Sequence, residues 1–211
     1  MLFDAAKNRR DVFCYGIMGF NESGKSTLAK YLAKLWKSAR PGMDVLAFDP
    51  QQNFGSVANK FMYEYEDWIE KALELRNGLL IMDDISILHT SNQMDKRLVR
   101  VFSMRPKTNI DIIYIIHGPK KMLEGLDLYT SDYFIFYTQA KKNDFRDKIS
   151  DYEPCFAACN LVRRYIKNYG KGTYPDFPYI HINNGSGKMS MVNMDQKKVE
   201  AMLKTQKNES K

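Results

Sequence analysis

Residues 12 to 27 read Val-Phe-Cys-Tyr-Gly-Ile-Met-Gly-Phe-Asn-Glu-Ser-Gly-Lys-Ser-Thr, an apolar run that leads into Gly19-x-x-x-x-Gly24-Lys25-Ser26. This spacing predicts a strand, a phosphate-binding loop and the start of a helix. The glycines let the backbone bend so that successive N–H groups turn toward phosphate oxygens, and the helix N-terminus adds its positive dipole end. The stretch therefore predicts a site for a nucleoside triphosphate.

Within this loop the residue types define separate roles. Lys25 is expected to reach the β and γ phosphate oxygens, and the Ser26 hydroxyl is expected to join the Mg²⁺ shell. The full set predicted to contact the nucleotide is Gly19, Phe20, Asn21, Glu22, Ser23, Gly24, Lys25, Ser26 and Thr27. A later stretch, Gly185-Ser-Gly187-Lys188, has Ile182 and Met189 where a second such loop needs Gly and Ser or Thr, so we interpret it as a hairpin turn.

Length and composition fit one α/β domain. The chain has 211 residues, of which 44% are hydrophobic, enough for a full core. We expect a core over about residues 11–150 and an added C-terminal part over 151–211. No apolar run approaches the roughly 18 residues that cross a bilayer, and the N-terminus lacks the apolar centre of a signal peptide. The sequence therefore predicts an intracellular protein.

The charge of the chain indicates the kind of partner it binds, and its cysteine content bears on disulfides and zinc sites. The formal net charge of +7 favours polyanionic partners such as nucleic acid. The three cysteines leave an odd number and no disulfide framework. Cys155 and Cys159 have helical spacing without a second Cys/His pair nearby, so we expect them on a buried helix face and not in a zinc site.

Strands and helices are predicted to alternate along the chain, as a parallel sheet with crossover helices requires. The expected fold is a three-layer P-loop NTPase sandwich of the ASCE or RecA-like strand order, followed by a β-hairpin and a helix. The expected strands are 11–18, 44–48, 79–82, 110–116 and 132–138, with a hairpin over 179–192. The expected helices are 25–38, 59–76, 91–104 (capped by Ser91 or Asn92), 153–167 and a Lys-rich segment from Asp195.

Polar residues follow two of the apolar strands. Asp83 and Asp84 come directly after Leu79-Leu-Ile-Met82, where a P-loop enzyme places a Mg²⁺ ligand and a group that acts on the attacking water. We expect Asp83 to bind Mg²⁺ and Asp84 to be catalytic. His117 ends the neighbouring apolar strand, where it can sense the γ-phosphate or orient water.

An arginine that acts on the site of a neighbouring subunit is a further expectation, because such a residue stabilises charge on the transferring phosphoryl group. Arg105, just before the 110–116 strand, is the first candidate and Arg100 is the second. The other arginines considered for this role are Arg97, Arg163 and Arg164.

The base is expected to be adenine. Guanine specificity usually needs an Asn-Lys-x-Asp element, and Thr138-Gln-Ala-Lys141 lacks its Asp. Asp83-Asp-Ile-Ser86 lacks the Gly of an Asp-x-x-Gly element. We therefore expect ATP and Mg²⁺ as the ligands.

The chain resembles the FtsK–HerA branch of P-loop ATPases over residues 11 to about 140. The resemblance is carried by Gly19–Thr27, Phe48-Asp-Pro50, Leu79–Asp84, Arg105 and Asn109–His117. In that family the sensor at the strand tip is commonly Gln or Asn, and the acid after the Mg²⁺ ligand is commonly Glu. Here those positions hold His117 and Asp84. The small size makes the chain more similar to viral genome-packaging ATPases than to chromosome pumps.

This resemblance implies a ring-forming ATPase that pumps DNA. It implies a pentamer or hexamer with ATP at subunit interfaces, one subunit's arginine completing the next subunit's site. It also implies a capsid, portal or membrane-vertex partner, and a place in the host cytoplasm or at the virion vertex. Basic loops would grip DNA phosphates without reading sequence. The candidates for these contacts are Lys107, Lys120, Lys121, Lys141 and Lys142.

Three other function classes remain open on the sequence alone. A small-molecule or nucleotide kinase shares the phosphate loop, and Arg163-Arg164 would then belong to its lid. A ParA-like partition ATPase is suggested by Val45-Leu-Ala-Phe-Asp-Pro-Gln-Gln52, although Gly19-Phe-Asn lacks that family's signature Lys. The third class is a nucleotide-gated assembly protein in which Asp84 performs little chemistry.

Overall fold

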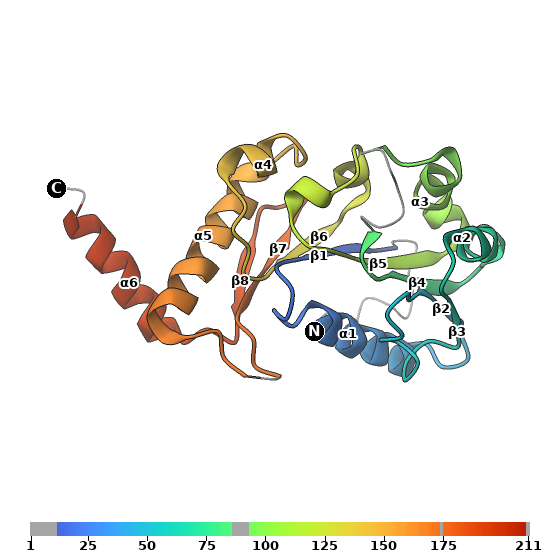
Figure 1. Cartoon of the computed structure of the whole chain (residues 1–211), viewed down its shortest axis with the longest axis horizontal. Coiled ribbons are helices and arrows are strands. Elements are labelled where there is room, and N and C mark those ends of the chain that lie inside the picture. Colours follow the sequence, from blue (N-terminus) through green and yellow to red (C-terminus); the bar gives the residue numbers. More distant parts are fainter. Residues whose placement is uncertain (1–11, 86–92, 174, 210–211) are drawn as a thin grey trace.

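One twisted sheet runs through the whole molecule (Figure 1). The structure is a computed structural model that describes residues 12–85, 93–173 and 175–209. Within these ranges the strand order is β3-β2-β4-β5-β1-β6-β7-β8. The strands are β1 (Cys14–Met18), β2 (Val45–Phe48), β3 (Lys60–Met62), β4 (Gly78–Met82), β5 (Ile110–Ile116), β6 (Asp132–Ile135), β7 (Tyr179–Asn183) and β8 (Met189–Val192).

The sheet is parallel from β3 to β6, and the β7–β8 hairpin joins it antiparallel to β6. The α-helices are α1 (Lys25–Ala39), α2 (Tyr65–Glu74), α3 (Lys96–Thr108), α4 (Lys142–Arg146), α5 (Tyr152–Tyr169) and α6 (Gln196–Glu209). Two single turns of 3₁₀-helix, η3 (Pro119–Lys121) and η4 (Leu126–Tyr129), connect β5 to β6. The sequence did not predict α4, η3 or η4.

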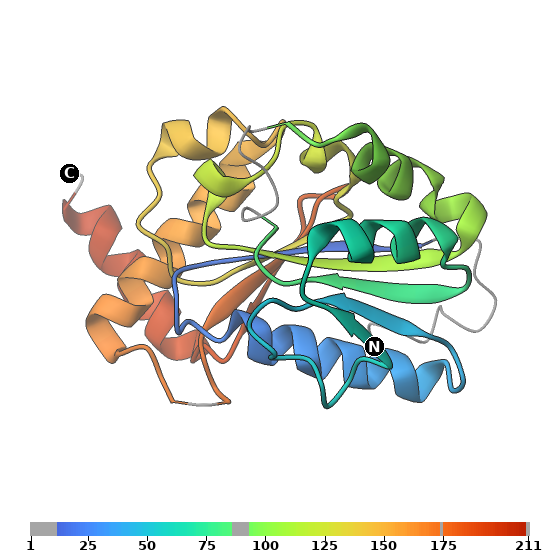
Figure 2. The same ribbon diagram turned by 45° about the vertical axis from the view of Figure 1, so that its right-hand side comes forward.

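Helices cover both faces of the sheet, which gives three layers (Figure 2). On one face α1 packs Leu28, Leu32 and Trp36 against alternate residues of the strands. On the other face α2, α3 and α5 bury a second core that includes Trp68 and Phe102. Because both faces are covered, the central strands β4 and β5 are buried at every position, as near-continuous apolar strands predict.

The position of β5 confirms the predicted class of P-loop fold. β5 lies between β1 and β4, with Ile112 paired to both Cys14 and Leu80. β1 precedes the phosphate loop, β4 leads into Asp83, and β5 leads into His117. β5 therefore separates β1 from β4. In a parallel sheet this arrangement brings the ends of all three strands to one edge.

Asp111 is a carboxylate inside the sheet, fully buried on β5. It accepts hydrogen bonds from the Trp36 indole and the Phe13 backbone N–H, both at 2.8 Å, and pairs with Arg40 at 3.1 Å. A buried carboxylate of this kind is tolerated because its partners replace the lost water. Through these contacts Asp111 ties the C-terminal end of α1 to β1 and β5.

The helix predicted over 59–76 is wrong in its first part, where the chain forms edge strand β3 and α2 begins only at Tyr65. Asn59 fixes this strand start: its N–H donates to Val45 O, and its side-chain oxygen accepts from Val45 N. Phe61 lies in this strand, and its side chain is 43% exposed. Pairing with β2 has therefore overridden a helical pattern.

The predicted helix over 91–104 is displaced toward the C-terminus. The proposed caps Ser91 and Asn92 lie outside the described residues, and α3 is capped by Asp95, whose Oδ1 accepts from Leu98 N at 2.8 Å. The helix continues through Pro106 to Thr108, past the expected end at residue 104. It ends at Asn109, whose left-handed backbone (φ 53°) terminates the helix.

The C-terminal part forms the predicted hairpin and helix. α6 packs Val199 and Met202 against Tyr165 of α5, so it extends from one end of the molecule (Figure 1). Cys155 and Cys159 are buried on the core face of α5, as predicted. Among the helices that the structure describes, none combines the length and apolarity that a bilayer crossing needs.

Candidate functional site

The carboxyl ends of the parallel strands surround a cavity of about 880 Å³. Residues from five regions line it: the loop after β1, the first turn of α1, the segment after β2, and the segments that follow β4 and β5. Its lining consists of Phe20, Asn21, Glu22, Lys25, Ser26, Gln51, Asp83, Asp84, His117 and Lys121. Residues from positions 20 to 121 thus meet where a ligand binds in open α/β sheets.

The loop after β1 has the backbone shape that the glycines predict. Gly24 has φ 97°, a left-handed conformation that starts α1, and a Cβ there would lie 2.5 Å from the Phe177 ring. At Gly19 a Cβ would lie 2.6 Å from Phe136 Cβ. Glycine is therefore required at Gly24 for its backbone conformation and for space, and at Gly19 for space alone.

Lys25 is nearly buried, at 5% exposure, in the first turn of α1. Its ammonium donates to the Phe20 carbonyl at 2.6 Å and lies 3.5 Å from His117 Nδ1. Burial lowers the pKa of Lys25 to about 8, although the charges of Asp83 and Asp84 oppose this effect. A phosphate in the cavity would stabilise the charged ammonium further.

His117 connects Lys25 to Asp84. Its Nε2 lies 3.1 Å from Asp84 Oδ2, while Nδ1 faces the Lys25 ammonium. This geometry fits the tautomer in which Nε2–H donates to the carboxylate. Asp84 itself has φ 52°, a left-handed backbone that is rare outside glycine and that turns the chain sharply after β4. Such conformations concentrate at functional sites.

Asp83 is held from the side by a residue after β2. The Asn53 side-chain amide donates to Asp83 Oδ2 at 2.9 Å. Asn53 is fixed in turn by Asp49, which is 1% exposed and accepts from Asn53 N and Phe54 N, each at 2.7 Å. Burial raises the pKa of Asp83, and the nearby carboxylates of Asp49 and Asp84 raise it further against the effects of Asn53 and Lys25.

These residues fit a magnesium ion. The Ser26 hydroxyl and the Asp83 carboxylate line the same cavity, and oxygen donors of this type are what Mg²⁺ prefers. Asp49 and Asp84 crowd Asp83 with like charge, which a divalent cation would relieve. Ser26 and Asp83, the residues predicted to hold the ion, are thus both at the cavity.

The predicted arginines do not face this cavity. Arg105 donates to the Tyr129 carbonyl and lies beside Cys14, the first residue of β1, so it is at the amino edge of the sheet. Arg100 borders a small crevice between α2 and α3, and Arg97 pairs with Glu66 at 2.6 Å. None of these three lines the cavity of its own chain, and a role toward a neighbouring subunit stays a prediction.

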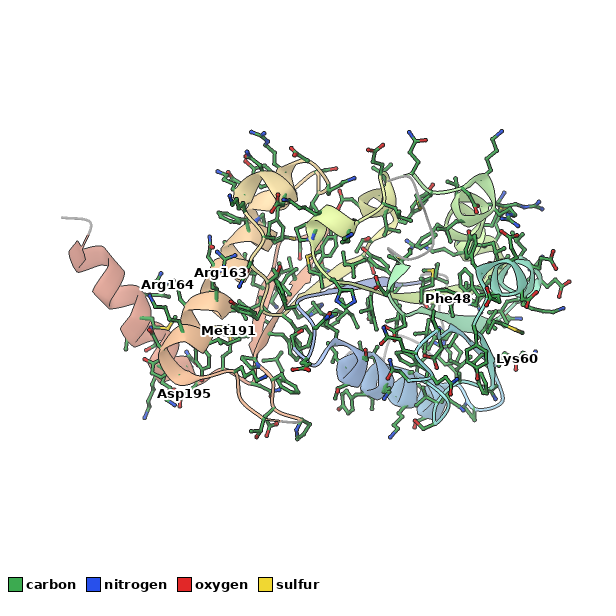
Figure 3. The ribbon with its side chains drawn as sticks, viewed as in Figure 1. Phe48, Lys60, Arg163, Arg164, Met191 and Asp195 are labelled. Atoms are coloured by element: carbon green, nitrogen blue, oxygen red, sulfur yellow. The ribbon has the colours of Figure 1, made fainter. Side chains whose placement is uncertain are left out.

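Arg163 and Arg164 lie on α5 (Figure 3), where both bind backbone carbonyls. Arg163 donates to the oxygens of Thr138 and Ala140, each at 2.9 Å, and Arg164 donates to that of Met202 at 3.2 Å. Arg163 therefore secures the segment after β6, and Arg164 attaches α6. Neither arrangement resembles the lid that a kinase would require.

Four of the five lysines expected to contact DNA lie on the same side as the cavity. Lys120 and Lys121 follow β5, and Lys141 and Lys142 follow β6, all with exposed side chains. Lys121 also lines the cavity. Lys107 differs, because it lies near the C-terminal end of α3 and thus near the amino edge of the sheet.

Sequence reasoning missed Asn53 and Phe177 and assigned no role to Asp49. Asp49 and Asn53 follow β2 at the same edge as Asp83, so the rule that placed Asp83 could have indicated them. Phe177 lies in an irregular segment after α5, and its contact with Gly24 has no local signal in the sequence.

Comparison with known proteins identifies the fold. No protein-family model matches the sequence, and no curated protein sequence matches it significantly. The structure is similar to the genome packaging NTPase B204 from Sulfolobus turreted icosahedral virus 2 in complex with ATP-gammaS (TM-score 0.64, 16% identity, covering 88% of this chain and 98% of that one).

Two further solved structures share the fold. One is the cytoplasmic domain of the Thermomonospora curvata Type VII secretion ATPase EccC, with TM-score 0.57 and 11% identity, covering 87% of this chain and 24% of that one. The other is the pCW3 conjugation coupling protein TcpA with ATPgS, with TM-score 0.55 and 15% identity, covering 92% of this chain and 65% of that one. These similarities establish the P-loop NTPase fold.

Proposed function

We propose that this protein hydrolyses ATP with Mg²⁺ to move DNA, as a ring-forming translocase that packages a viral genome into a capsid. The observation that carries the proposal is the common cavity beside the phosphate loop, lined by Lys25, Ser26, Asp83, Asp84 and His117. Positive charge, oxygen ligands for a metal and a candidate base are the parts that phosphoryl transfer to water requires.

Each side chain has a task in this proposal. Lys25 and the first-turn N–H groups of α1 bind the phosphates, and Ser26 and Asp83 hold Mg²⁺, which neutralises charge on the β and γ oxygens. Asp84 accepts a proton from the attacking water. His117 holds the Asp84 carboxylate in place. Its contact with the Lys25 ammonium is broken when bound phosphate draws that ammonium away from the ring.

The names of the similar structures support the choice of ATP and of DNA movement. B204 is described as a genome packaging NTPase and was solved with ATP-gammaS, and TcpA is described as a conjugation coupling protein with ATPgS. We extend the packaging role to this chain because it covers 98% of B204. With this role we also propose that the protein acts in the host cytoplasm or at a virion vertex, beside a capsid or portal partner.

DNA binding is proposed through the exposed lysines after β5 and β6. Lys120 and Lys142 form long ion pairs, with Asp144 at 3.4 Å and Glu153 at 3.7 Å. Both lysine side chains are more than half exposed, so phosphate can replace these carboxylates at little cost. Because the arginines do not reach the cavity of their own chain, a subunit-shared site in a pentamer or hexamer would complete it.

The test is the ATPase rate per subunit, measured against protein concentration with and without duplex and single-stranded DNA. A shared-site motor predicts a rate per subunit that rises with concentration and with DNA. Lys25→Ala serves as the background control in the same series. A rate per subunit that is constant and indifferent to DNA would contradict the translocase and direct the search to a phosphoryl acceptor.

A further inference from the structure

The central sheet ends in two strands that have a neighbour on one side only. Within the part of the chain that the structure describes, β3 pairs with β2 alone and β8 with β7 alone, so the outer edge of each is open. Lys60 of β3 and Met191 of β8 lie on opposite sides of the molecule (Figure 3). Open edges are usually protected by charge or proline. Neither strand contains proline, and their one charged side chain, Lys60, bonds to Asp44 at 2.8 Å.

The outer edge of β8 is formed by the backbone of Met189 and Met191. Asn183 N donates to Lys188 O, and the bonded positions of an antiparallel pair alternate along each strand. Ser190 is therefore the next residue that bonds to β7, and the N–H and C=O groups of Met189 and Met191 point outward. The side chains of both methionines are at least 40% exposed. This edge thus combines outward backbone groups with exposed apolar side chains.

The outer edge of β3 has the same character. Met62 O accepts from Asp49 N, so Met62 bonds to β2, and the backbone groups of its neighbours Phe61 and Tyr63 point outward. The side chains of Phe61 and Tyr63 are both exposed, and their ring centroids lie 5.7 Å apart. Both ends of the sheet therefore offer backbone groups and apolar side chains to another strand.

The two edges fit each other in strand direction and in the faces that they present. β8 runs in the same direction as β3, because β7 is antiparallel to both β6 and β8. Phe61 is paired with Ala47 and shares its α1 face, whereas Met191 is paired with Ile180 and shares its α5 face. If β8 of a second copy continues the sheet beyond β3, its methionines lie next to Met62 on one face. The aromatic rings of β3 then cover that β8 on the other face.

The two ends of the sheet also carry opposite charge. At the β3 end, Glu64, Glu66 and Glu70 are exposed at the start and on the outer side of α2, which packs on β2 and β3. At the β8 end the exposed lysines lie around the end of α5, before β8 and on α6: Lys167, Lys171, Lys188, Lys197 and Lys198. Because α2 and α5 cover the same face and α6 packs on α5, a second copy in the same orientation brings its basic helices beside the acidic α2.

We propose that β8 of one copy of this chain pairs in parallel with β3 of the next copy, so that one sheet continues from subunit to subunit. Such a contact joins two different surfaces head to tail, and it forms a ring when the rotation between copies closes. The proposal rests on the proposed function, which takes the working form to be a ring. β3 pairs with β2, and Gln51 in the segment after β2 lines the cavity, so the next copy approaches the cavity from this side.

Pairing of like edges is the alternative. Two β8 edges would bring the lysines of both copies together, and two β3 edges would bring the glutamates together. Like charges placed side by side oppose association. The charges at the two ends of the sheet therefore favour the contact between unlike edges.

The experiment is sedimentation velocity of the full chain over a range of concentrations, with one proline variant for each edge. Met191→Pro and Phe61→Pro each remove one outward N–H, and proline is tolerated at edge positions of this kind. We expect the parent chain to form species larger than a dimer and each variant alone to stay monomeric at the same concentrations. An equimolar mixture of the two variants should form a dimer and nothing larger, because each variant keeps the edge that the other has lost. Met191→Val and Phe61→Leu, which keep the N–H and an apolar side chain, are the matched controls and should assemble like the parent.

Three results would overturn the interface. They are a parent chain that stays monomeric with and without Mg·ATP, proline variants that assemble as the parent does, and a mixture that forms no dimer. A homodimer of one variant alone would assign the contact to like edges and reject the proposed one. Mg·ATP binding is measured on the same samples, and all variants should bind it like the parent because neither Met191 nor Phe61 lines the cavity. Normal Mg·ATP binding without the expected assembly rejects the interface alone, whereas a parent chain that binds no Mg·ATP rejects the proposed function.

Discussion

Lys25 combines burial with charge, and this combination makes its replacement informative. The side chain contacts Phe20 O and the His117 ring, and it does not take part in the two apolar cores. We expect Lys25→Ala to reduce ATP turnover by at least about 100-fold, because a point charge on the transferring phosphoryl group is lost. Thermal unfolding should shift little. Full turnover in this variant would contradict the nucleotide site.

Replacement of Asp84 is expected to reduce ATP turnover without weakening nucleotide binding. Asp84→Asn keeps the size and the contact with His117 but removes the acceptor of the water proton. We expect turnover to fall by about 100-fold or more, with Mg·ATP affinity within a factor of about two. Asp67→Asn, on the exposed face of α2, is the control for charge loss. An equal loss of nucleotide affinity would assign Asp84 to the metal or to the fold.

Asn53 is expected to act on the metal through Asp83. Asn53→Ala removes the donor 2.9 Å from Asp83 Oδ2 and leaves that carboxylate free to rotate. Loss of such an outer contact typically weakens metal binding about 10- to 100-fold. The measurement is nucleotide binding titrated with Mg²⁺, which does not depend on turnover. An unchanged Mg²⁺ requirement would show that Asn53 merely closes the loop after β2.

Among the single residues of the site, the sequence predicted those that belong to a local sequence pattern. The phosphate loop has a fixed spacing, and Asp83, Asp84 and His117 end apolar strands, so their common edge followed from the parallel sheet. Asn53 and Phe177 lie in irregular segments, and their contacts depend on how those segments cross the strand ends. The Arg105 contact with Tyr129 O depends likewise on η4, which the sequence did not indicate.

Among the elements, the C-terminal hairpin is attached to the parallel sheet by a polar cluster. His181 Nε2 lies 2.8 Å from Asp132 Oδ1, and the Asn183 amide donates to the same oxygen at 3.2 Å. Burial alone would raise the pKa of Asp132, but these hydrogen bonds outweigh burial and leave that pKa below its usual value. The ionised carboxylate therefore stabilises the junction of β6 and β7.

The pH dependence follows from this direction. The Asp132 contribution is complete above about pH 4, the pKa of an aspartate in an unfolded chain, and is lost as the pH falls through the lower folded pKa. We expect Asp132→Asn to lower the free energy of unfolding at neutral pH and to reduce its decline in acid. Denaturant titrations at about pH 7 and pH 3 measure this. Parallel acid profiles for both chains would contradict it.

Element order and type were largely predictable, and the exceptions show where local patterns stop deciding. Phe61, Tyr65 and Trp68 share helical spacing, yet pairing with β2 takes Lys60–Met62 into the sheet. The helix around Arg105 passes through Pro106 because α3 packs Leu98, Val101 and Phe102 into the core on its N-terminal side of the proline. In both cases, contacts with residues distant in the sequence determined the secondary structure.

For the whole molecule, the proposed DNA contacts follow the carboxyl edge of the sheet. A nonspecific electrostatic interface predicts that affinity for duplex DNA falls steeply between about 50 and 200 mM salt. Lys121→Ala and Lys141→Ala should each reduce the slope of log K against log salt by about one. Lys107→Ala, near the opposite edge, should leave the slope unchanged. Equal slopes for all variants would remove these loops from the interface.

The contact between Phe177 and Gly24 joins the phosphate loop to a segment more than 150 residues away in the chain. Any rearrangement of the loop on binding must be accommodated by this ring, and hence by the residues that lead into β7. Thermodynamic reciprocity then applies. If a change in the hairpin alters nucleotide affinity by some factor, bound nucleotide alters the local opening equilibrium of the hairpin by the same factor. Amide exchange in β7 and β8 therefore reports whether the nucleotide site is occupied.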